Sequence, residues 1–130
     1  MAGAGHDELL RDGFAVVPGA VDVALCERAR ADVARFRREN RARIAANLDE
    51  RERLFRVVNL PAVVDALAEV FTANRALPVC DTFFGAETVC YTSLYFGRGS
   101  QQPLHRDSPL FATRPAGRYL GVWVALEPTD

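Results

Sequence analysis

The sequence contains no lysine, and all 16 of its basic residues are arginine. We interpret this bias as a codon-composition effect of a GC-rich genome, because the forked donors of arginine matter only at bidentate sites. With 17 acidic residues, the formal net charge is −1. So small a charge argues against a strong overall field for nucleic acid or for a membrane surface.

Long hydrophobic runs are missing as well. No apolar stretch approaches the roughly 20 residues of a membrane-spanning helix. The N-terminus also lacks the basic segment followed by an apolar one that marks a signal peptide. We therefore expect a cytoplasmic protein that does not enter a membrane.

Cysteine and histidine are scarce. The three cysteines, Cys26, Cys80 and Cys90, are odd in number and form no C-x-x-C pair. Neither a disulfide framework nor a zinc knuckle is indicated, and we interpret all three as buried thiols in a reducing compartment. The two histidines are His6 and His105. His6 lies near the N-terminus, where chains commonly fray.

The composition that remains is that of an ordinary globular domain. The chain has 130 residues, of which 49% are hydrophobic and 25% charged. A domain of this size buries a core without needing disulfides or structural metals. We expect one α+β domain over residues 1–130, mainly helical over 1–86 and built from strands over 87–130.

The first part of the chain carries helical patterns. A short helix is predicted from His6 to Arg11, followed by an apolar strand over 14–17. Apolar residues then recur every three or four positions from Val23 to Asn40, which predicts an amphipathic helix. Pro61 suits the first turn of another helix, and a last helix is predicted over 77–84 with Gly85 as its stop.

Residues 28–56 are dense in arginine, with acidic residues interleaved. We interpret the stretch as a solvated helix face with charge pairs. The alternative is a patch for nucleic acid or phosphate. Few aromatic residues are present to stack on bases, so we expect no nucleic-acid partner.

After Gly85 the residues become β-branched and aromatic. The segments 88–96 (TVCYTSLYF) and 119–126 (YLGVWVAL) are predicted to be strands. Because side chains alternate along a strand, Tyr91, Ser93 and Tyr95 are expected on one face. Trp123 is expected to share a face with residues 119, 121 and 125.

His105 and Asp107 are the candidates for chemistry. They stand two residues apart in the segment 102–107 (QPLHRD), and in an extended segment such residues point the same way. An imidazole and a carboxylate form two-thirds of the facial triad that holds non-haem ferrous iron. The pattern alone is weak, since it occurs by chance in many chains and a surface turn is the more common explanation.

Several segments together resemble the phytanoyl-CoA dioxygenase family. They are residues 12–19 (DGFAVVPG), 91–96 (YTSLYF), 102–107 (QPLHRD) and 121–126 (GVWVAL). The resemblance covers both ends of the chain and is weakest in the middle helices. It implies N-terminal helices packed on the first strands of a double-stranded β-helix, or jelly roll.

The resemblance also implies a set of roles. His105 and Asp107 match the first two ligands of Fe(II), and Trp123 matches an aromatic position beside the 2-oxoglutarate co-substrate, although a core tryptophan is the alternative. We expect Tyr91, Ser93 and Tyr95 to face the same cavity, with plain core packing as the alternative for at least one of them. Gln102 would orient the ligands, unless it is simply an exposed loop residue. The implied activity is oxidation, usually hydroxylation, of a small organic substrate.

The sequence departs from the family pattern at its C-terminal side. The family's distal metal-binding histidine and its arginine for 2-oxoglutarate do not appear before Asp130, and Arg114 and Arg118 do not match that arginine. A jelly roll needs about eight strands, so the barrel is expected to be incomplete. Three explanations for the missing features stay open. The chain is a fragment of a longer enzyme, a truncated gene product, or a remnant with another role.

We therefore expect this chain alone to be catalytically weak or inactive. The alternative function is a non-catalytic half-barrel that acts as a binding module and associates with itself through open sheet edges. The sequence does not define the substrate.

Overall fold

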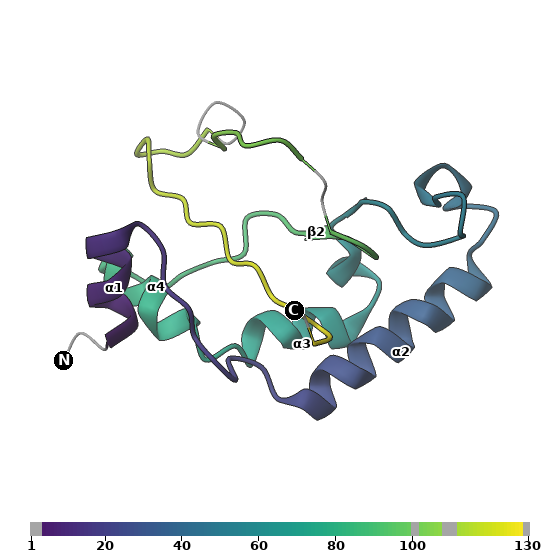
Figure 1. The fold of residues 1–130 in the computed structure, drawn as a ribbon, viewed down its shortest axis with the longest axis horizontal. Coiled ribbons are helices and arrows are strands. Elements are labelled where there is room, and N and C mark those ends of the chain that lie inside the picture. The colour runs from purple at the N-terminus through teal and green to yellow at the C-terminus, as the bar shows by residue number, and fades with distance from the viewer. Residues whose placement is uncertain (1–3, 100–101, 108–111, 129–130) are drawn as a thin grey trace.

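The computed structural model describes residues 4–99, 102–107 and 112–128. Its elements, in chain order, are α1 (Ala4–Asp12), α2 (Val23–Glu39), η1 (Ala45–Asn47), β1 (Val57–Val58), η2 (Leu60–Ala62), α3 (Asp65–Thr72), α4 (Leu77–Phe84) and β2 (Leu94–Tyr95). The helices lie along one side of the molecule, and the later, extended part of the chain runs beside them (Figure 1). Helices with a small open sheet make an α+β arrangement, as predicted.

The helices follow their sequence signals closely. Cys26, Ala29 and Val33 of the stripe predicted for α2 are buried, together with Leu25, which was not predicted. Val23, which was predicted to belong to the stripe, is 73% exposed at the start of the helix. Helix α4 has the predicted bounds, and it ends at Gly85, whose φ of 64° lies in the left-handed region. Glycine adopts this conformation readily because it has no Cβ to clash with the preceding turn.

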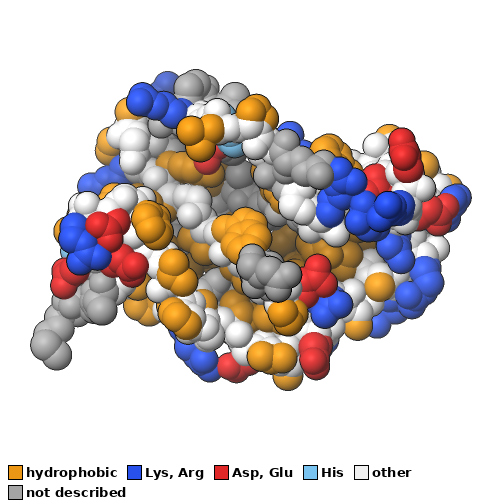
Figure 2. Space-filling model, in the orientation of Figure 1, with side chains coloured by type: hydrophobic (Ala, Val, Ile, Leu, Met, Phe, Trp, Pro, Cys, Tyr) orange, Lys and Arg blue, Asp and Glu red, His pale blue; other side chains and the backbone are white. Residues whose placement is uncertain are grey.

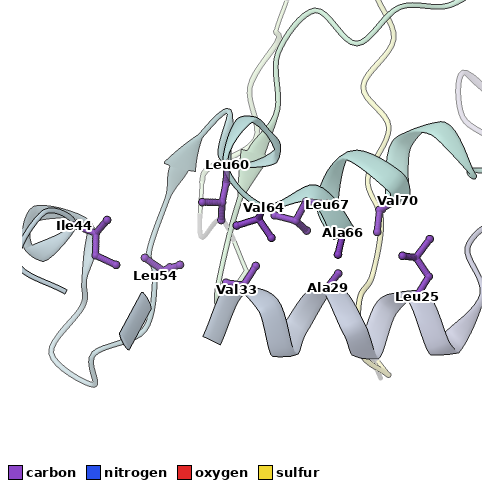
Figure 3. Close-up of a cluster of buried hydrophobic side chains, with 10 residues drawn as sticks. All are labelled: Leu25, Ala29, Val33, Ile44, Leu54, Leu60, Val64, Ala66, Leu67 and Val70. Carbon is purple, nitrogen blue, oxygen red and sulfur yellow. The ribbon is translucent and has the colours of Figure 1, made fainter. Parts of the chain in front are cut away.

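The core lies between α2 and α3. Ala29 of α2 is 0% exposed and faces Ala66 of α3, and these small side chains let the two helices approach closely (Figure 3). Leucines from the connecting segments extend this core away from the helix pair. The buried members are Leu25, Ala29, Val33, Ile44, Leu54, Leu60, Val64, Ala66, Leu67 and Val70.

A two-stranded antiparallel sheet joins the helical part to the later segments. Val57 pairs with Tyr95 and Val58 pairs with Leu94. Asn59 extends the contact between the two strands by one residue, and its backbone is in the left-handed conformation, with φ of 53°. Its backbone N–H donates to the Ser93 carbonyl at 2.9 Å, and its side-chain oxygen accepts from the Ser93 N–H at 3.0 Å.

The strand predictions were largely wrong. Residues 14–17 form no strand, the predicted strand over 88–96 is paired only at Leu94–Tyr95, and residues 119–126 belong to no ladder among the described residues. A strand needs a neighbour for its N–H and C=O groups, and local preference does not supply one. The described residues thus contain one small sheet and no barrel. Residues 100–101, 108–111 and 129–130 of the predicted β region lie outside the described residues.

Two further expectations concern the cysteines and the membrane. Cys26 and Cys80 are buried free thiols, as predicted, whereas Cys90 is exposed. The prediction for Cys90 was wrong because the segment around it is unpaired and lies at the surface. Among the helices that the structure describes, none combines the length and the apolar character needed to cross a membrane.

The arginine-rich stretch forms many of the expected charge pairs. Arg35 pairs with Asp32 within α2, and Arg53 pairs with Asp49 in the following loop. Other pairs reach between elements, including Arg41 with Glu52. The predicted charge pairs are therefore present, but of these three pairs only the Arg35–Asp32 pair lies on a helix face, because α2 ends at Glu39.

Candidate metal centre

His105 and Asp107 lie on an irregular segment that belongs to no helix or strand. Nδ1 of His105 lies 2.8 Å from the carbonyl oxygen of Pro103. Nε2 of the same ring lies 3.2 Å from Oδ1 of Asp107. The side chains are 40% and 44% exposed. The structure thus brings together the two residues that the sequence singled out as ligands.

The Pro103 contact decides which ring nitrogen carries the proton. A carbonyl oxygen only accepts hydrogen bonds, so Nδ1 must be the donor in this contact. In a neutral imidazole, Nε2 then presents its lone pair toward the Asp107 carboxylate. Two electron-rich atoms face each other, and either a proton or a cation between them relieves their repulsion.

The spacing of these two atoms fits a metal ion. Ligand atoms about 2.1 Å from a common centre, at a right angle to each other, lie about 3.0 Å apart. The observed separation of 3.2 Å is close to this value. The same separation also suits a hydrogen bond from a protonated imidazole to the carboxylate. The geometry therefore supports a two-ligand half-site.

The other predicted site residues are not gathered around this pair. Trp123 is 75% exposed and Tyr91 is 66% exposed, and Gln102 is exposed too. The alternative that Trp123 is a core tryptophan was wrong, and the cofactor-binding roles of these three residues stay predictions. Within the described ranges, no group of three or more His, Cys, Asp or Glu side chains is placed to hold a metal ion.

Two contacts of the half-site were not predicted from the sequence. The group that orients His105 is the backbone carbonyl of Pro103, and side-chain identities do not reveal such a contact. Burial, and then the negative charge of Asp107, raises the pKa of Tyr119. Tyr119 thus lies within electrostatic range of the half-site, although it is distant in sequence.

A separate, strongly polar hollow lies at the far end of the arginine-rich stretch. It is lined by Leu48, Asp49, Glu50, Arg51, Arg53, Phe55 and Arg98. Asp49 holds this loop together, since it accepts backbone hydrogen bonds from Arg53 and Arg51 at 2.9 Å each. Hydrogen bonding to Arg53 is the main cause that lowers the pKa of Asp49. His105 and Asp107 do not line this hollow.

Comparison with known proteins settles the family. A model of the phytanoyl-CoA dioxygenase family matches residues 9–130. The chain belongs to the phytanoyl-CoA dioxygenase family. Members of this family are typically dependent on Fe(II) and 2-oxoglutarate. Comparisons with curated proteins and with solved structures gave no match.

The matched range includes the half-site. The matched range contains the described segment 102–107 and also the segment around Trp123. It therefore covers every residue for which a metal or cofactor role was predicted. The helices α2, α3 and α4 fall in the same range, although their sequences contributed little to the resemblance.

Proposed function

We propose that this chain contributes His105 and Asp107 as two protein ligands of a non-haem Fe(II) centre in a 2-oxoglutarate-dependent oxygenase. The observation that carries the proposal is the 3.2 Å approach of Nε2 of His105 to Oδ1 of Asp107. Membership of the family supports it independently. The finer fold that we propose is the helical part and the first strands of a jelly roll.

The residues of the half-site have separate tasks. The carbonyl oxygen of Pro103 accepts a hydrogen bond from Nδ1–H of His105. This contact keeps the lone pair of Nε2 directed toward Asp107. Such an outer contact fixes both the tautomer and the orientation of a metal-binding histidine. Asp107 supplies a negative charge that offsets part of the charge of a divalent cation. When bound, Fe(II) with 2-oxoglutarate would supply the oxidation of an unactivated C–H bond in a small organic substrate by dioxygen.

An anaerobic titration tests this proposal. The chain is mixed with Fe(II) and 2-oxoglutarate, and the visible absorption of the iron–2-oxoglutarate complex is followed. We expect a weak but saturable absorption that is lost in His105→Ala and in Asp107→Ala. Matched controls are His6→Ala, which removes the other histidine, and Asp7→Ala, which removes a carboxylate that is 70% exposed.

The outcomes separate the two functions considered for this chain. Absorption that needs His105 and Asp107, and that survives both control substitutions, supports the iron site. Absorption that persists in His105→Ala places iron elsewhere and contradicts the proposal. A complete lack of saturable binding leaves the non-catalytic binding module as the better description of this chain.

A further inference from the structure

We draw no further inference here: the strongest candidate, the polar hollow in the loop region after α2, where arginine side chains gather (Figure 2), carries none, because Asp49 already pairs with two of its arginines, Arg53 and Arg98, and nothing in the structure shows what covers it.

Discussion

Asn59 connects the helical part of the chain to the segment that continues toward His105. It lies between β1 and η2, and its left-handed backbone, with φ of 53°, lets the chain change direction there. Its side-chain oxygen accepts hydrogen bonds from the Ser93 N–H at 3.0 Å and from the Thr92 hydroxyl at 3.1 Å. Asn59 thus combines a backbone requirement with two side-chain contacts, and substitutions can remove these features one at a time.

Three substitutions at position 59 should fall in a definite order of stability. Asn59→Asp keeps the acceptor oxygens and tolerates the left-handed conformation, so it should lie within about 0.5 kcal/mol of the wild type. Asn59→Gly keeps the backbone freedom but loses two exposed hydrogen bonds, which should cost about 1–2 kcal/mol. Asn59→Ala loses the same two hydrogen bonds, and it keeps a Cβ in the left-handed region without the polar side chain that lets asparagine tolerate this conformation, so the total should reach about 2–3 kcal/mol.

Urea denaturation of the four proteins, followed by circular dichroism, measures these differences. The slopes with denaturant should stay equal, so that the shifts in midpoint report stability alone. If Asn59→Gly is as stable as the wild type, the two side-chain hydrogen bonds contribute nothing. If Asn59→Ala and Asn59→Gly are equally stable, the argument from backbone conformation is wrong.

Two further predictions concern the loop beside the polar hollow. A Cβ on Gly97 would lie 2.5 Å from the backbone oxygen of Leu54, so Gly97→Ala should lower the free energy of unfolding by roughly 1–3 kcal/mol. Gly99→Ala, where a Cβ meets nothing within 4 Å, should be close to neutral in the same urea titration. The pKa of Asp49 is lowered below its ordinary value of 3.8 in the folded state, so its contribution to stability is present above that value and is lost as the pH falls through it and below. Asp49→Asn should remove this part of the acid dependence of the denaturation midpoint, and an unchanged pH profile would contradict the assignment.

The helices could be predicted from the sequence because their signals are local. The apolar spacing along α2 and the left-handed stop at Gly85 depend on neighbouring residues, and both appear in the structure. The strands could not be predicted in the same way. Residues 119–126 have strong strand preference, but a strand also needs a partner strand, and the described residues form no ladder with them.

The candidate site could also be predicted only in part, because only some of its contacts depend on neighbouring residues in the sequence. His105 and Asp107 are two residues apart, and their convergence follows from local geometry. The orientation of Trp123 depends on what covers its segment, and the structure leaves it 75% exposed. The carbonyl of Pro103, which fixes the imidazole, is a backbone group whose role depends on the fold of the loop.

The central claim is that His105 and Asp107 bind one metal ion together. The tautomer of His105 and its response to a metal ion test this claim most directly. Nitrogen NMR distinguishes Nδ1 from Nε2 and reports which of them carries a proton. With the diamagnetic ion Zn²⁺ as a probe, we predict that Nδ1 keeps its proton and that Nε2 shifts on binding, with the affinity falling in Asp107→Ala. A proton on Nε2 of the neutral ring, or a zinc response that Asp107→Ala leaves unchanged, would contradict the assignment of these residues as a metal-binding pair.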